Sequence, residues 1–132
     1  VLRTRRWMAS HIGGGPFERL PQAELYASIV VHEVVHGVLH QNTGQFLMSH
    51  TAGEYIAYAL QIASLPVGAR QNFLATQPLR GNPKEFVFSD ILHSLAPFLF
   101  AAQAYEHFAV SAEPCRYAEL LQRELEFVVP AY

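Results

Sequence analysis

The stretch IVVHEVVHGVLHQ, residues 29–41, is the most informative part of the chain. Its apolar residues occupy nearly every side of a helical projection, which predicts a core helix. Positions four apart share one face of an α-helix, so the imidazoles of His32 and His36 can reach one metal ion. A glutamate and two histidines are costly in such a helix unless they are paired or bound to metal. The pattern H-E-x-x-H in this setting therefore predicts a zinc site, although a buried helix can also match five residues by chance.

Glu33 lies beside the ligand pair rather than in it. It can therefore polarise a water molecule without occupying a coordination position. Zinc lowers the pKa of a bound water to about 7, which makes a nucleophile available at neutral pH. The motif thus predicts that Glu33 is a general base next to two ligands.

A catalytic zinc usually has three protein ligands and one open position. The sequence predicts a second helix over about residues 49–65, after the helix stop and turn at residues 42–44. This helix carries Glu54, 18 residues after His36. A helix–turn–helix of this length can return Glu54 to the two histidines.

Two further histidines compete with Glu54 for the third position. His50 is one helical turn before Glu54 on the same face. We favour Glu54, because His50 is close to the helix start, where its ring can remain solvated. His40 lies about 12 Å along the first helix from His32, which is too far for the two to ligate one ion together with His36.

The helix pair resembles the glutamate-zincins, the thermolysin-like clan of zinc metallopeptidases, over residues 22–65. It also fits an uncharacterised bacterial family of that type. The resemblance implies that His32, His36 and Glu54 are ligands of one zinc ion per chain and that Glu33 is the general base. It further implies a peptide or protein substrate and favours a periplasmic or secreted bacterial protein.

Two features depart from that clan, and a third excludes the separate metzincin clan. Its members often have an aspartate one turn after the glutamate ligand, where this chain has Tyr58, so the partner of a ligand histidine must come from elsewhere. They also have a β-sheet before the active-site helix, whereas only 31 residues precede His32. Residues 7–12 are a candidate edge strand. Asn42 replaces the third histidine of an elongated metzincin motif.

Zincins often use a later histidine or tyrosine to stabilise the oxyanion. By this resemblance His93 is a candidate catalytic residue, and Tyr105 is its alternative. A lone histidine or tyrosine on an apolar helix is more often a packed core residue, and that interpretation also stands.

Composition restricts the class of protein. The 132 residues predict one domain, with 51% hydrophobic and only 15% charged residues. A net charge of −2 gives no excess of basic residues for binding nucleic acid. No apolar run reaches the ~20 residues of a transmembrane helix. The apolar surplus suggests a partner or a missing segment on the surface. Cys115 is the only cysteine, which excludes an intrachain disulfide.

The periodicity predicts a mainly α fold with about five helices and at most one or two short N-terminal strands. The resemblance implies that this compact helical domain is zincin-like. Residues 1–21 are expected to be an irregular arm, and the chain, which starts at Val1, is expected to be trimmed from a longer protein. The expected helices are residues 21–41, 49–65 and 66–76, a fourth that starts at Ser89 and kinks at Pro97, and a fifth over 114–127.

Of two functions that the sequence allows, we favour the first and keep the second as the alternative. The first is a zinc metallopeptidase that hydrolyses peptide bonds. The second is a non-catalytic helical zinc-binding or protein-interaction domain derived from a zincin. The short upstream segment and the apolar composition favour the second, whereas the presence of Glu33 favours the first.

Overall fold

The computed structural model describes residues 15–43 and 49–110. These residues form five α-helices and two short 3-10 helices and contain no β-strand, which confirms the mainly α fold. The expected strand at residues 7–12, the expected helix at 114–127 and Cys115 lie outside the described residues. The elements are η1 (Pro16–Arg19), α2 (Gln22–Thr43), α3 (His50–Ser64), α4 (Val67–Ala75), η2 (Pro83–Glu85), α5 (Asp90–Leu95) and α6 (Pro97–Val110).

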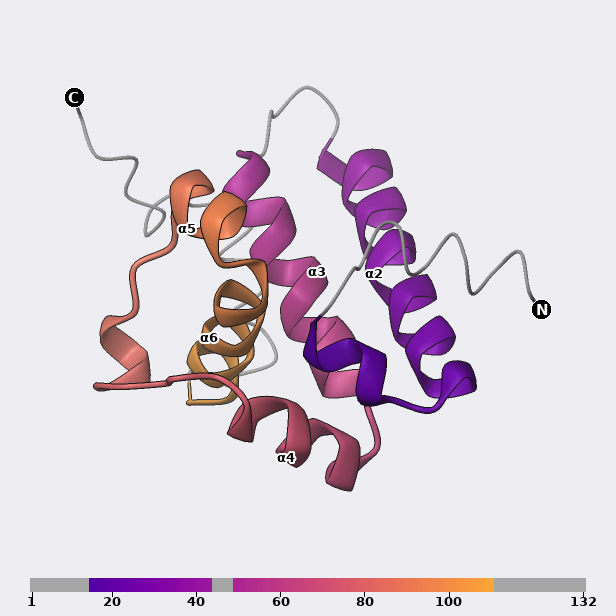
Figure 1. Cartoon of the computed structure of the whole chain (residues 1–132). Helices are drawn as coiled ribbons and strands as arrows, with labels where there is room; N and C mark the ends of the chain where they lie inside the picture. Colours follow the sequence, from indigo (N-terminus) through magenta and orange to yellow (C-terminus); the bar gives the residue numbers. More distant parts are fainter. Residues whose placement is uncertain (1–14, 44–48, 111–132) are drawn as a thin grey trace.

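Helix α3 is the central element, with α2 on one side and α6 on the other (Figure 1). It runs antiparallel to α2, so the two form a helical hairpin. Small side chains let α3 and α6 approach closely, because an alanine keeps the two backbones apart by only a methyl group. The alanines with no exposed surface are Ala57 and Ala59 on α3 and Ala101, Ala102 and Ala104 on α6.

Two serines mark helix starts. The Ser49 side chain accepts a hydrogen bond from the Ala52 backbone N–H, and Ser89 accepts one from that of Leu92. Each serine satisfies a donor that the first helical turn leaves unpaired. Pro66 stands directly before α4, as the sequence predicts for a proline at a helix start.

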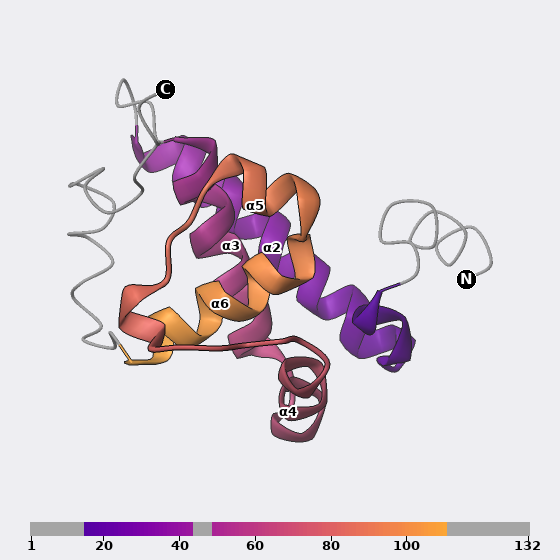
Figure 2. The ribbon, with the colours of Figure 1, turned by 60° about the vertical axis from the view of Figure 1, so that its left-hand side comes forward.

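The sequence predicts a kink at Pro97, and the structure instead has a complete break. Ala96 has φ −143° and ψ 64°, outside the helical region, and separates α5 from α6. A proline disfavours helical geometry in the residue before it and has no N–H of its own to donate. The break turns α5 away from the line of α6 and places it near the start of α3 (Figure 2).

The described part of the expected irregular arm, residues 15–21, contains a short helix. Residues 16–19 form η1, whose Phe17 is only 3% exposed. Its ring stacks on Phe73 of α4, with centroids 4.7 Å apart, and meets Phe98 of α6 edge-on. An aromatic side chain that reaches two distant helices fixes the short segment against the core.

The prediction that α2 is a core helix is wrong. One face carries Leu25 and Ser28, which are buried, and the opposite face is open to solvent. A helix at the edge of a bundle is covered by its neighbours on only one face. Hydrophobicity alone does not show which of its residues those neighbours cover. The open face is itself apolar, a stripe at four-residue intervals that we call the α2 outer stripe: Tyr26, Val30, Val34 and Val38, each 41–56% exposed.

None of the described helices has the combination of length and hydrophobicity that crossing a membrane requires.

Candidate metal centre

The structure brings His32, His36 and Glu54 together between α2 and α3. The Nε2 atoms of the two histidines are 3.1 Å apart. Glu54 Oε2 lies 3.5 Å from His32 Nε2, and Glu54 Oε1 lies 3.3 Å from His36 Nε2. These side chains form a group that can hold a metal ion, with one potential ligand atom from each residue.

The donor set and spacing fit zinc. Two imidazoles and one carboxylate are the ligands of several catalytic zinc sites. Ligand atoms about 2.0–2.2 Å from a tetrahedral ion lie about 3.3–3.5 Å from each other. The imidazole nitrogens are 3.1 Å apart, and each lies 3.3 or 3.5 Å from a different oxygen of Glu54, distances close to that spacing. Lone pairs that converge so closely repel one another unless a cation, either a proton or a metal ion, lies among them.

The charge of Glu54 is stabilised by its surroundings. Burial pushes the pKa of Glu54 upward, but its interaction with the His32 side chain and the charges of the neighbouring histidines outweigh burial and hold that pKa below its usual value. The carboxylate is therefore ionised at neutral pH, which is the form that binds a metal.

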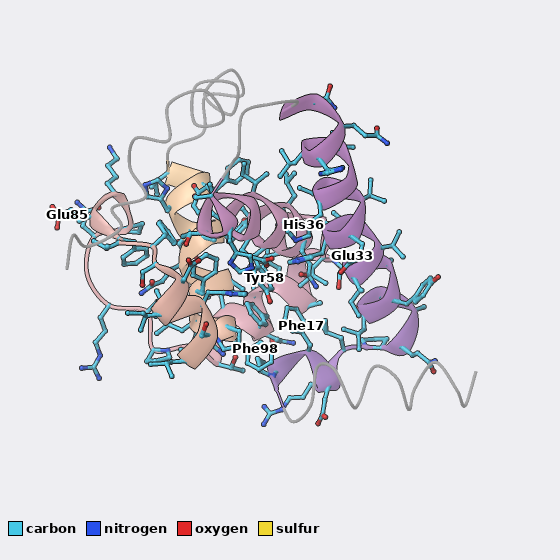
Figure 3. All side chains as sticks on the ribbon, turned by 90° about the horizontal axis from the view of Figure 1, so that it is seen from above. Phe17, Glu33, His36, Tyr58, Glu85 and Phe98 are labelled. Carbon is cyan, nitrogen blue, oxygen red and sulfur yellow. The ribbon has the colours of Figure 1, made fainter. Side chains whose placement is uncertain are left out.

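Glu33 stands outside this group but next to it. Figure 3 labels Glu33 and His36 on α2 and Tyr58 on the neighbouring helix α3, and the charge of Glu33 acts on Tyr58. The Tyr58 ring packs edge-on against His32, with centroids 4.5 Å apart. Burial, followed by the negative charges of Glu54 and Glu33, raises the pKa of Tyr58 to about 12. Glu33 is exposed and therefore open to solvent beside the group.

His50 reaches the edge of the group. Its Nε2 lies 3.6 Å from Glu54 Oε1, and its Nδ1 lies 3.1 Å from Asp90 Oδ1. The side chain is 62% exposed and is not one of the three residues whose donor atoms converge. Asp90 also accepts a hydrogen bond from the Thr51 hydroxyl, and these hydrogen bonds lower the pKa of Asp90. The interaction of His50 is therefore mainly with the start of α5.

His93 of α5 also touches Glu54. Its Nε2 lies 3.5 Å from Glu54 Oε2, and its ring packs against Phe100. Burial lowers the pKa of His93, and the opposing effect of Glu54 does not restore it. His93 thus presents a largely neutral imidazole beside the group at neutral pH. Of the other candidates, Tyr105 packs against the hydrophobic core and under the Arg70 guanidinium, away from these contacts.

Sequence reasoning missed Gln61, which contacts His32 from the next turns of α3. Gln61 Oε1 lies 2.9 Å from His32 Nδ1, and Gln61 Nε2 donates to Ser28 Oγ at 3.3 Å. The signal was present, because Gln61 is seven residues after Glu54 and so shares its helix face. Gln61 is therefore the hydrogen-bond partner of the His32 ring. Tyr58, at the position where thermolysin-like enzymes often have an aspartate, does not provide such a partner.

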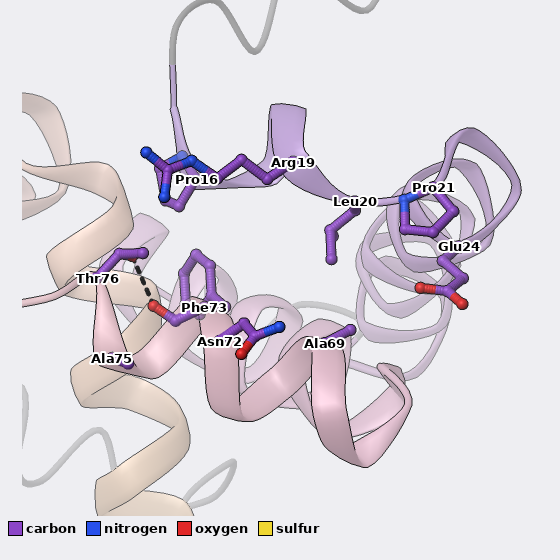
Figure 4. A pocket seen from close by; sticks show the side chains of 10 residues that line it. All are labelled: Pro16, Arg19, Leu20, Pro21, Glu24, Ala69, Asn72, Phe73, Ala75 and Thr76. Carbon is purple, nitrogen blue, oxygen red and sulfur yellow. Dashed lines mark hydrogen bonds between the residues drawn. The ribbon is translucent and has the colours of Figure 1, made fainter.

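A separate cavity of about 520 Å³ lies between η1, the start of α2, and α4 (Figure 4). Its walls include Arg19, Glu24, Phe73 and Thr76. None of the residues that line it belongs to the metal-binding group. It therefore adds no evidence about that centre.

Comparison with known proteins identifies a family. Residues 1–126 match a family of unknown function, DUF6639. The chain belongs to this family. No curated protein and no solved structure matches it. The DUF6639 description states no activity, so the chemistry has to be argued from the metal-binding group itself.

Proposed function

We propose that this DUF6639 chain binds one zinc ion through His32, His36 and Glu54 and hydrolyses peptide bonds. The observation that carries the proposal is the convergence of two imidazoles and one carboxylate at 3.1–3.5 Å, with the exposed Glu33 directly after His32 in the chain. A purely structural site has no need for that additional carboxylate. The likeness to glutamate-zincins over residues 22–65 supports the same chemistry.

Each residue has a stated part in the reaction. Zinc, when bound, supplies a Lewis acid that polarises a carbonyl oxygen and acidifies water. Glu33 accepts a proton from the attacking water and delivers it to the leaving amine, so that one carboxylate serves as base and then as acid. His93 offers a side chain that can donate a hydrogen bond to the oxygen on which negative charge develops.

Metal analysis and one conservative variant test the proposal. The purified full chain, loaded with zinc and dialysed, should retain about one zinc ion per molecule. Glu33→Gln should retain the metal and lose hydrolysis of a mixture of fluorogenic peptides, whereas His36→Ala should lose both. If Glu33→Gln loses zinc as His36→Ala does, Glu33 is a ligand and the assignment of roles is wrong.

The second candidate is a non-catalytic helical zinc-binding or protein-interaction domain. The α2 outer stripe favours it, because four exposed apolar side chains in a row are typical of a contact surface. This candidate predicts a zinc-loaded chain that hydrolyses no peptide of the mixture, with wild type and Glu33→Gln alike.

A further inference from the structure

A chain of buried hydrogen bonds leads from the backbone of α2 to the proposed ligand His32. The Ser28 hydroxyl donates to the Leu25 carbonyl oxygen at 2.8 Å. The Gln61 carboxamide bridges Ser28 and His32. Its Nε2 lies 3.3 Å from Ser28 Oγ, and its Oε1 lies 2.9 Å from His32 Nδ1. Ser28 is 1% exposed and Gln61 is 4% exposed, so water does not compete for these bonds.

The direction of each bond follows from the number of hydrogens available. A serine hydroxyl has one hydrogen, and Ser28 gives it to Leu25. Ser28 Oγ can then only accept, so the carboxamide atom facing it must be the NH2 group of Gln61. The oxygen of Gln61 therefore faces His32 Nδ1, and an oxygen without hydrogen can only accept. His32 must carry its proton on Nδ1.

This proton position leaves the other ring nitrogen as a lone-pair donor. His32 Nε2 is the atom that lies 3.1 Å from His36 Nε2 and 3.5 Å from Glu54 Oε2, inside the proposed metal site. In the neutral ring, a proton on Nδ1 frees Nε2 for coordination. The opposite tautomer would place an N–H where a ligand is needed.

We infer that Gln61 is a positioning residue of the metal centre, which together with Ser28 selects the Nδ1–H tautomer of His32 and holds its ring for coordination through Nε2. The neutral carboxamide of Gln61 thus fixes the tautomer and orientation of a ligand histidine, as a carboxylate does in many histidine–metal sites. The effect on metal affinity rests on the proposed function, whereas the tautomer of His32 follows from the hydrogen bonds alone.

The tautomer is tested on the metal-free full chain. Two-bond 15N–1H correlation spectra of the histidine rings, recorded at about pH 8, distinguish protonated from unprotonated ring nitrogens. We expect His32 to show a protonated Nδ1, with the assignment made by comparison with His32→Gln. In Gln61→Leu that preference should be lost, and in Gln61→Glu it should be kept. A protonated Nε2 and bare Nδ1 on His32 of the wild-type chain would overturn the inference.

The consequence for the metal is tested with cobalt(II), whose visible absorption reports tetrahedral coordination. Gln61→Leu should weaken cobalt binding about 10- to 100-fold, the usual effect of losing such a partner, and Gln61→Glu should restore it. Ser28→Ala, a milder change in the same hydrogen-bond chain, should give a smaller loss.

The matched control is Gln103→Leu, which removes a carboxamide from α6 whose buried Oε1 has no hydrogen-bond partner among the described residues. It should bind cobalt as the wild type does. If Gln61→Leu binds cobalt as tightly as wild type, the positioning role is wrong. If the wild type binds no cobalt or zinc, the proposed metal function fails, and the ring spectra still decide the role of Gln61 in the tautomer.

Discussion

At the scale of single residues, Glu54 organises the centre. Its Oε1 faces His36 and His50, and its Oε2 faces His32 and His93. The Glu54 carboxylate is mostly buried among four imidazoles, and its negative charge can be balanced by protons or by a metal ion. Removal of the carboxylate would take away the negative charge that attracts either kind of cation. If the proposed metal site is correct, Glu54 should therefore matter more to metal binding than either peripheral histidine.

Glu54→Gln should lower zinc affinity by more than about 100-fold. Loss of a residue that only positions a ligand lowers metal affinity about 10- to 100-fold, and loss of a ligand itself should lower it further. His50→Ala should change that affinity by less than about 10-fold, since its exposed ring interacts mainly with Asp90. Competition with a chromophoric chelator measures both. The opposite ranking would make His50 the third ligand.

The lowered pKa of His93 predicts a pH dependence for the metal-free protein. Below the ordinary pKa of about 6.5 the unfolded chain takes up a proton at this residue before the folded chain does. The free energy of unfolding should therefore fall as the pH drops through about 6.5 and level off above it. Urea unfolding between about pH 5 and 8 should give a shallower dependence for His93→Gln than for wild type. A steeper dependence in that variant would contradict the assignment.

The sequence predicted part of this centre. His32 and His36 were predicted from a motif, and Glu54 from its place in the following helix, because periodicity shows which residues share a face. The same motif predicts Glu33 as a general base, and that role stays a prediction. Gln61 and the pair of His50 with Asp90 were not found. Those contacts depend on how two helices cross and where α5 turns, which local patterns do not determine.

At the scale of elements, helix ends were predictable where a side chain caps them. Ser49, Ser89 and Pro66 mark starts close to those expected, because their chemistry acts within one turn. Pro97 gave the wrong prediction, a kink rather than a break. Whether a helix bends or ends at a proline depends on what its two halves pack against, and here α5 packs against both α6 and α3.

Gly53 offers a test of how closely α2 and α3 pack at the metal centre. A Cβ at this position would lie 3.9 Å from two atoms of the His36 ring, an ordinary contact distance. Gly53→Ala should therefore stabilise the protein by up to about 1 kcal/mol, because alanine favours helix over glycine.

Zinc affinity should be unchanged in Gly53→Ala, whereas the branched side chain of Gly53→Ile should displace His36 and weaken binding. Urea unfolding and chelator competition measure the two effects. Loss of zinc affinity in the alanine variant would show that the two helices are closer there than the structure places them.

At the scale of the whole molecule, the core centres on α3 and α6 and extends to η1 and α4, and α2 is an outer helix with one covered face. The sequence could not reveal this, since α2 is apolar on both sides and only the arrangement of helices determines which side is covered. The proposed metal centre consequently lies between a packed helix and a peripheral one. Its two histidines come from the peripheral helix, and its carboxylate comes from the central one.

Two substitutions distinguish a core residue of α6 from an exposed residue on the outer face of α2. Phe100 of α6 has no exposed surface and packs against Tyr58, Phe88 and the ring of His93. Phe100→Ala should lower the free energy of unfolding by about 3–5 kcal/mol, as expected for a large buried aromatic side chain. Val34, 56% exposed on the outer stripe, should tolerate Val34→Thr with a change within about 0.5 kcal/mol.

Urea unfolding of the metal-free chain measures both variants under the same conditions. Since His93 packs on Phe100, the alanine variant should also shift the ring resonances of His93, while Val34→Thr should leave them in place. A cost for Val34→Thr comparable to that for Phe100→Ala would mean that the outer face of α2 is covered in solution. The α2 outer stripe would then be an occupied contact surface, which is the arrangement that the protein-interaction alternative requires.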